Sequence, residues 1–211
     1  MAVQHRTPER VDLRTDGNTT SFMAVPGQVV ADPAALGLAA FALTTFLLSA
    51  QNAGWTHGGD AWLGFALFYG GLAQFAAGIM EFRNRNVFGA TAFGTYGGFW
   101  MGLFAYVQFA APHSSNVNND LGWILLAFAI FNAYMLLWST RVNMAVFMVF
   151  LTLQVTEVVL FIGFFRDATT LIKAGGIIGI ITAAVAWYAS AAVVANGMGT
   201  RRVLPVGKPM W

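Results

Sequence analysis

The chain has 211 residues, of which 57% are hydrophobic and only 9% are Asp, Glu, Lys or Arg. Ordinary soluble domains carry about 25% charged residues, so this composition excludes a water-soluble enzyme and a disordered protein. The remaining class is a polytopic membrane protein, whose apolar surface faces lipid. The net charge of +2 is too small to indicate a nucleic acid partner, and the absence of Cys excludes disulfides and Cys metal sites.

The chain divides into two polar ends and an apolar centre. Residues 1–30 are mixed in charge and lack the apolar stretch of a signal peptide, so we expect a flexible cytoplasmic tail. Residues 31–197 are expected to form a transmembrane domain, and residues 198–211 a second cytoplasmic tail. The centre holds six apolar segments, each of roughly 19–27 residues and long enough to cross a bilayer core. They cover residues 33–55, 61–82, 88–111, 121–139, 142–165 and 170–196.

These segments predict an all-α fold of six transmembrane helices, because they are too long for barrel strands and lack a period of two. Basic residues indicate the orientation. Nine of the 11 Lys and Arg lie in the tails or in the connections after the second and fourth segments, and the exceptions are Arg166 and Lys173. Both termini are therefore expected on the cytoplasmic side of a multi-pass protein of the plasma membrane.

The first segment has a clear start, since Asp32 can cap the free N–H groups and Pro33 suits the first helical position. Small residues also recur at four-residue spacing in two other segments, a pattern that permits close helix approach in lipid. These stripes are Gly94, Gly98 and Gly102 in the third segment, and Gly175, Gly179 and Ala183 in the sixth. Packing is the expected role of both stripes, and backbone approach to a solute is the alternative.

No catalytic site is apparent in the sequence. The phosphate-binding loop, the G-x-S-x-G elbow and the H-E-x-x-H zinc motif are all absent. The three histidines, His5, His57 and His113, fall in a tail or in connections. We therefore expect no enzyme activity, no cofactor and no metal.

One charge lies clearly within the membrane, at Glu157 near the middle of the fifth segment. An intramembrane carboxyl is energetically costly and is expected to face the bundle interior or water. Proton coupling or pore lining is one interpretation, and a hydrogen-bonded carboxyl at a helix interface is the other. Several uncharged polar side chains and many aromatic rings share the segments, and aromatic rings that meet on a pore axis form a dry constriction. The residues alone thus indicate a small channel or transporter for a small polar solute.

Local strings resemble a known family. The stretch Asp32–Leu38, DPAALGL, resembles the N-P-A-P-L-G-L signature of the acetate uptake transporters, the succinate–acetate permease or YaaH-type family. The resemblance continues through residues 68–74, FYGGLAQ, residues 88–100, FGATAFGTYGGFW, and the tail at 199–207. Asp32 replaces the Asn of the signature and Ala35 replaces its second Pro. The signature residues at the helix start are Asp32, Pro33, Leu36 and Gly37.

The resemblance implies a homo-hexamer of six-helix protomers in the lipid bilayer, each with its own pore. It further implies a hydrophobic constriction of Phe, Tyr and Leu, which falls on Phe41, Tyr96 and Leu153, with Leu151 as the next choice for the Leu. The polar side chains expected to contact the substrate are Thr44, Asn52, Gln74 and Thr91.

The expected function is the movement of acetate through this constriction, with succinate and other small monocarboxylates as further candidates. A bare anion in a dry pore loses its hydration at high cost, so passage linked to a proton is expected, with Glu157 or Asp32 as mediator. A urea or amide channel and an ammonium exporter are the alternatives.

Overall fold

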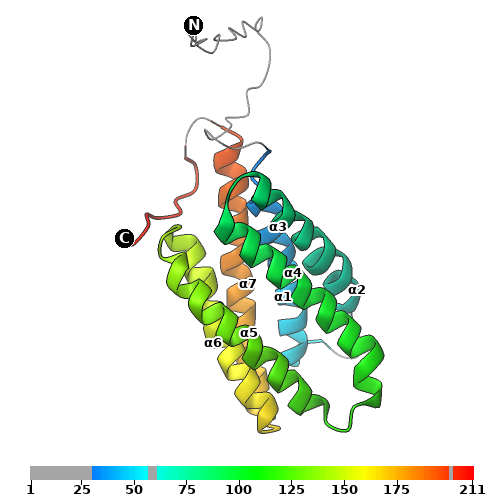
Figure 1. Ribbon diagram of the computed structural model, residues 1–211. Helices are drawn as coiled ribbons and strands as arrows, with labels where there is room; N and C mark the ends of the chain where they lie inside the picture. Colours follow the sequence, from blue (N-terminus) through cyan, green and yellow to red (C-terminus); the bar gives the residue numbers. More distant parts are fainter. Residues whose placement is uncertain (1–29, 57–60, 200–201) are drawn as a thin grey trace, which may run out of the picture.

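The computed structural model describes residues 30–56, 61–199 and 202–211. The expected N-terminal tail, apart from Val30, lies outside the described residues, as do His5 and His57. The rest is a bundle of helices that stand side by side as long rods (Figure 1).

Six helical runs cross the bundle, close to the six predicted segments. Five of them are long and apolar enough to cross a membrane, and the sixth, Val87–Ala105, contains five glycines that lower its hydropathy. The second run begins as α2 and passes through the π-helix η1 into α3, and the third ends in the π-helix η2 and the short 3₁₀ helix η3. The elements are α1 (Ala34–Asn52), α2 (Leu63–Phe65), η1 (Ala66–Ala73), α3 (Gln74–Arg83), α4 (Val87–Ala105), η2 (Tyr106–Ala110), η3 (Ala111–His113), α5 (Val117–Ser139), α6 (Met144–Phe165) and α7 (Thr169–Gly197). The prediction of an all-α, six-helix membrane protein is confirmed.

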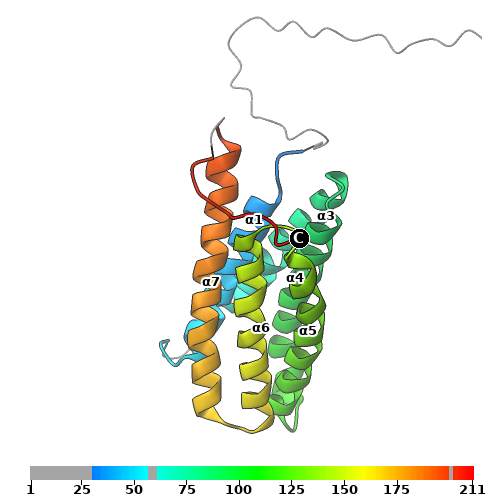
Figure 2. The same ribbon diagram turned by 90° about the vertical axis from the view of Figure 1, so that its left-hand side faces the viewer.

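The helices form one packed set in which α1 is central. It contacts α7 along most of its length and also contacts η1 and α3. On one side α7 packs on α6 and α6 on α5, and on the other side α3 packs on α4 (Figure 2). Contacts between α4 and α5 are few, although these helices follow one another in the chain.

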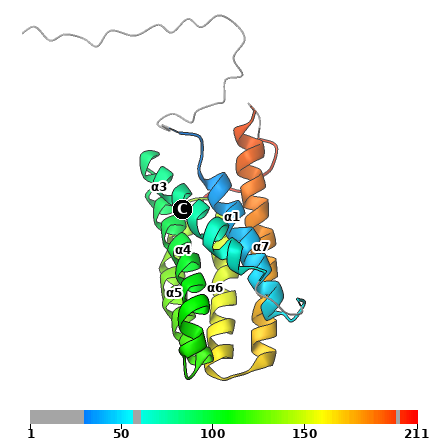
Figure 3. The same cartoon turned by 90° about the vertical axis from the view of Figure 1, so that its right-hand side faces the viewer.

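Hydrogen bonds tie both ends of the described chain to turns at one end of the bundle. The backbone N–H of Val30 donates to Asn84 Oδ1 at 3.1 Å in the α3–α4 turn, and that of Met210 donates to Thr140 O at 2.8 Å in the α5–α6 turn. Both ends of the described chain therefore lie at the same end of the bundle as these two turns (Figure 3). This is the arrangement that the basic residues predict, and the orientation in a membrane stays a prediction.

The start of α1 follows the prediction. Asp32 Oδ1 accepts a hydrogen bond from the N–H of Ala34 at 2.9 Å, and Pro33 has helical angles of φ −69° and ψ −16°. Because Pro has no N–H to leave unpaired, it costs little at this position.

The two small-residue stripes differ in what they meet. On α7, a Cβ at Gly175 would lie 2.6 Å from the Leu160 side chain, and Gly179 faces Ser49 of α1, so this stripe packs inside the protomer as expected. On α4, a Cβ at Gly94, Gly98 or Gly102 would meet nothing within 4 Å. Gly98 and Gly102 are exposed and face out of the protomer, whereas the backbone of Gly94 lies against Gly78 of α3.

Candidate functional site

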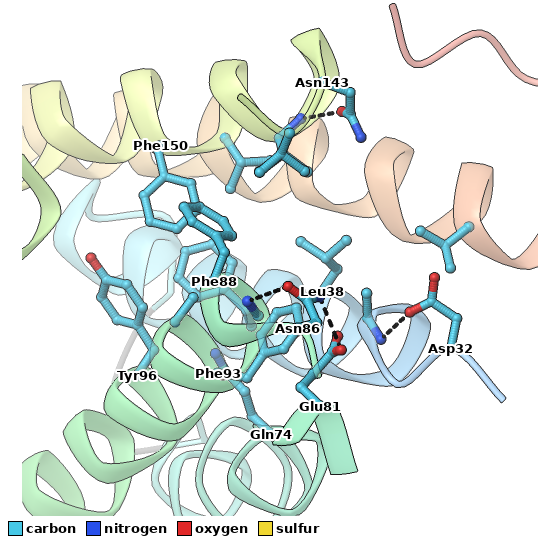
Figure 4. Close-up of a pocket in the computed structure, with 18 of the residues that line it drawn as sticks. Asp32, Leu38, Gln74, Glu81, Asn86, Phe88, Phe93, Tyr96, Asn143 and Phe150 are labelled. Atoms are coloured by element: carbon cyan, nitrogen blue, oxygen red, sulfur yellow. Dashed lines mark hydrogen bonds between the residues drawn. The ribbon is translucent and has the colours of Figure 1, made fainter. Parts of the chain in front are cut away.

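A cavity of about 170 Å³ opens at the end of the bundle that holds the two tied turns. A buried water needs only about 10–15 Å³ of such space, so a short organic solute fits. Its mouth is polar, with Asp32 before α1, Glu81 near the end of α3, and Asn86 and Asn143 at the starts of α4 and α6 (Figure 4). Lys, Arg and His do not occur among its lining residues.

Apolar side chains form the walls below this mouth. Leu38 comes from α1, Phe88 and Phe93 from α4, and Val149 and Phe150 from α6. The rings of Phe88 and Phe150 meet edge to face with centroids 5.2 Å apart, which joins α4 to α6 across the cavity. Since these walls offer no hydrogen bonds, an ion that enters loses hydration without replacement.

Phe41, Tyr96 and Leu153 lie together at the inner end of the cavity, which all three line. They are 5%, 4% and 7% exposed, and the Phe41 and Tyr96 rings are 5.7 Å apart in an edge-to-face contact. Figure 4 shows Tyr96 at the end opposite Asp32. Three different helices, α1, α4 and α6, thus bring one apolar side chain each to a single point.

Helix register explains why Leu153, rather than Leu151, reaches this point. Val146, Val149, Phe150 and Leu153 all line the cavity, and their spacing of three and four residues defines one face of a helix. Leu151 lies off that face and is half-buried outside the cavity.

Of the four polar side chains expected to contact a substrate, the structure places only Gln74 at the cavity. Gln74 is 1% exposed, and its Oε1 has no hydrogen-bond partner. Thr44 instead donates to Ala40 O at 3.0 Å within α1, Asn52 ends α1 away from the mouth, and Thr91 is half-buried on α4 outside the cavity lining.

The signature residues have separate positions. Asp32 lines the mouth, and Pro33 is buried at the start of α1. Gly37 allows close contact with α4, since a Cβ there would lie 2.7 Å from the Phe93 ring. Leu36 is 45% exposed and faces away from the bundle.

Glu81 has a different partner from the expected one. The sequence suggests an interfacial ion pair with Arg83 or Arg85, but both arginines are exposed. The Glu81 carboxyl instead accepts a hydrogen bond from Asn86 Nδ2 at 3.0 Å. The expected ion pair is wrong because α3 ends at Arg83 and Arg85 takes a left-handed φ of 58°, which directs the chain into the next helix.

Glu157 does not line the cavity, although it lies beside one of the residues that close it. It is 4% exposed, and Tyr96 Oη lies 3.3 Å from its Oε1. Asn132 and Gln154 are bonded to the same cluster. The sequence shows these two only as polar residues within apolar segments, and no spacing links α5 to α6, so the cluster itself was not predicted.

Comparison with known proteins gives a consistent result. Residues 16–208 match the GPR1/FUN34/yaaH family. The succinate-acetate/proton symporter SatP of Escherichia coli is 35% identical, over 85% of this chain and 96% of its own length. Accumulation of dyads protein 2 of Saccharomyces cerevisiae is 40% identical over 81% of this chain, which spans 64% of the yeast protein.

A solved structure described as the bacterial acetate channel SatP superimposes with a TM-score of 0.81 at 34% identity, covering 84% of this chain and 99% of the other. The same helical arrangement thus accompanies sequence similarity along nearly the whole described bundle. The chain belongs to the GPR1/FUN34/yaaH family of multi-pass membrane proteins.

Proposed function

We propose that this protein moves acetate, or a similarly short carboxylate, across the plasma membrane. The solute enters the cavity at its polar mouth and passes between Phe41, Tyr96 and Leu153. The observation that carries the proposal is the convergence of these three buried side chains, from three helices, at the inner end of a cavity open at one end of the bundle. The similarity to the succinate-acetate/proton symporter SatP and to the SatP acetate channel supports the choice of solute.

The lining chemistry favours a solute that can donate a hydrogen bond. The oxygens of Asp32 and Glu81 line the mouth, Gln74 Oε1 is buried without a partner, and no lining residue is basic. A carboxylate anion would meet negative charge at the mouth and lose hydration at the constriction. A protonated acid avoids both costs and can donate its proton to an oxygen of the cavity. We therefore propose proton-linked passage, with Asp32 and Glu157 as the mediators.

The direct test is uptake of labelled acetate by proteoliposomes that contain the purified protein, with and without an imposed proton gradient. We expect uptake that acidifies the vesicle interior and that increases when the outside is more acidic. Uptake that leaves internal pH unchanged and does not respond to the gradient would reject proton linkage while leaving acetate transport in place. Absence of uptake would reject acetate transport itself.

Substitutions at the constriction test the route. Phe41→Ala removes one of the three side chains at the inner end of the cavity. We expect the ratio of succinate uptake to acetate uptake to rise about tenfold, because an apolar wall contributes roughly 1–3 kcal/mol to discrimination by size. Phe109→Ala is the matched control, since Phe109 is 66% exposed and outside the cavity. An unchanged preference in Phe41→Ala would remove this residue from the route.

Urea and ammonium are the alternative solutes. The similarity to proteins described as acetate permeases or symporters does not favour them. The same proteoliposomes distinguish them, since a carboxylate pathway takes up labelled acetate in the presence of excess urea or ammonium. Competition by either compound would contradict a carboxylate-selective route.

We further propose that the protomers assemble as a homo-hexamer, each with its own pathway. The exposed glycines of α4, Gly98 and Gly102, support an interface on this face, because small residues let helices of neighbouring protomers approach closely in lipid. Gly98→Leu is expected to reduce the assembly to smaller species in light scattering from detergent solution. Gly197→Leu is the control, since this exposed glycine ends α7 and its Cβ would also meet nothing within 4 Å.

A further inference from the structure

Three buried polar side chains and one half-buried amide form a cluster behind Phe41, Tyr96 and Leu153. Tyr96 comes from α4, Asn132 from α5, and Gln154 and Glu157 from α6. Tyr96 Oη lies 3.0 Å from Asn132 Oδ1 and 3.3 Å from Glu157 Oε1. Tyr96 thus closes the cavity with its ring and contacts this cluster with its hydroxyl.

Two backbone carbonyls fix the direction of every hydrogen bond in the cluster. Gln154 Nε2 donates to Ala129 O at 3.2 Å, so Gln154 Oε1 must be the acceptor at its other side. Asn132 Nδ2 donates to Gln154 Oε1 and to Phe150 O, both at 2.9 Å. A carbonyl oxygen cannot donate, so neither amide can be turned over without losing these bonds. Asn132 Oδ1 is consequently an acceptor only.

The single hydroxyl proton of Tyr96 cannot serve two acceptors. Asn132 Oδ1 needs it, and the amide has no proton of its own to offer on that atom. The contact between Tyr96 Oη and Glu157 Oε1 then becomes a hydrogen bond only if the carboxyl carries a proton and donates it to the tyrosine oxygen. Both contacts of the Tyr96 hydroxyl are thus full hydrogen bonds at the same time only when Glu157 is neutral.

The surroundings of Glu157 agree with a neutral carboxyl. Its Oε2 is buried without a partner, and Tyr96 is the titratable side chain bonded to it. Helices α1 and α4 contain no Asp, Glu, Lys, Arg or His, and α5 and α7 carry their single charges, Asp120 and Lys173, near their starts. Lys173 is exposed and lies beside Gly54, past the end of α1. No cation is thus placed to compensate an ionised carboxylate in this part of the described structure.

We infer that Glu157 holds a proton while the constriction is closed, and that release of this proton turns the Tyr96 hydroxyl from Asn132 to Glu157. The inference rests on the proposed function. It adds a proton-dependent lock, by which we mean the hydrogen bonds that hold the Tyr96 hydroxyl while the pathway is closed. The proton passes to water or to a carboxylate solute in the pathway. The carboxylate left behind then competes for the tyrosine proton, and Asn132 and Gln154 act as positioning residues that hold the hydroxyl in the closed arrangement.

An infrared measurement tests the protonation state without reference to transport. A protonated carboxyl in an apolar site gives a C=O absorption distinct from that of a carboxylate. We expect such a band in the wild-type protein at neutral pH, its loss in Glu157→Gln, and its retention in Asp167→Asn, the control at an exposed carboxyl between α6 and α7. An identical carboxyl band in wild type and Glu157→Gln would overturn the inference, even if acetate uptake proves absent.

Flux against pH tests the consequence for the lock. One proton can change a flux by at most about tenfold per pH unit. We expect Glu157→Gln to remove one such step from the pH profile, because glutamine can donate to Tyr96 Oη at every pH, as the protonated acid does. Tyr96→Phe should remove the same step, and the double variant should show no further change. Additive effects, or an unchanged pH profile in Glu157→Gln with acetate uptake intact, would refute the lock and leave the proposed transport standing.

Discussion

Two buried carboxyl groups lie on either side of the proposed constriction, and they differ in the chemistry of their neighbours. Glu81 at the mouth is 1% exposed, and Glu157, one helical turn past Leu153, is 4% exposed. Each has one oxygen with a partner and one without. Glu81 faces an amide N–H that can only donate, whereas Glu157 faces a hydroxyl that also contacts a second acceptor, Asn132 Oδ1.

This difference separates two roles for the same side chain. A carboxyl that receives an N–H bond can remain charged, particularly where the cavity admits water, and Glu81 lines the cavity. A carboxyl that donates has to be neutral, as inferred for Glu157, and the one Lys of α7, Lys173, is exposed near the start of that helix. Burial alone therefore does not predict the state of an intramembrane carboxyl, because the direction of its hydrogen bonds also matters.

The largest expected effect comes from placing the same cation at both positions. Glu157→Lys is expected to lower the free energy of unfolding by about 3 kcal/mol, the approximate cost of a lysine at the centre of a membrane helix. Glu81→Lys should cost less, about 1 kcal/mol, because a lysine near a helix end can extend its ammonium group to water. Thermal unfolding of both variants in detergent measures the difference. Equal losses would show that the two sites are equally sealed from solvent.

Replacing each glutamate by glutamine should distinguish the two sites, because only one of the two variants should show acetate uptake that depends on salt. Glu81→Gln removes negative charge from the mouth, which above neutral pH repels the acetate anion before it is protonated. We therefore expect initial acetate uptake above neutral pH to rise about twofold at low salt, as a residual interaction of about 0.4 kcal/mol implies. High salt should abolish the gain, since the screening length falls to about 3 Å at 1 M. Initial uptake rates across a salt series measure this effect. Glu157→Gln should respond equally at low and high salt, and a salt-sensitive Glu157→Gln would contradict its enclosure.

The sequence predicts much of this fold because hydropathy along one chain is enough to find helices that face lipid. All six segments coincide with helical runs to within a few residues, and Asp32 and Pro33 start α1 as their chemistry suggests. The resemblance to the acetate uptake transporters indicates Phe41, Tyr96 and Leu153 as site residues, and the structure places all three at one cavity. Their action as a constriction remains a prediction.

Features that depend on neighbours in space were not predictable in the same way. The two small-residue stripes look alike in sequence, yet one packs against α1 and α6, whereas two of the three glycines of the other are exposed. Glu81 and Arg85 have the spacing of a helical ion pair, but the helix ends between them. The contact of Asn132 with Gln154 depends on the register of α5 against α6, which neither helix determines alone.

The smallest expected effect is on stability, and it measures the hydrogen bond that Asn86 donates to Glu81. Asn86 caps α4 by accepting from Gly89 N at 3.1 Å and also donates to Glu81. Asn116 caps α5 in the same way, accepting from Asn119 N at 3.0 Å, and no hydrogen bond to a carboxyl is present at its side chain in the described structure. Asn116→Ala should therefore cost about 1 kcal/mol of stability, the usual value of a cap.

Asn86→Ala should cost about 1 kcal/mol more than Asn116→Ala, since it removes the same cap and also leaves the Glu81 carboxyl without its donor. Unfolding of the two variants in detergent, below and above neutral pH, gives the difference directly. The excess cost should shrink in acid, where a protonated Glu81 no longer needs the amide N–H as strongly. An excess that stays constant with pH would mean that Glu81 is neutral throughout, and the contrast between the two carboxyl groups would then lie only in their distance from the mouth.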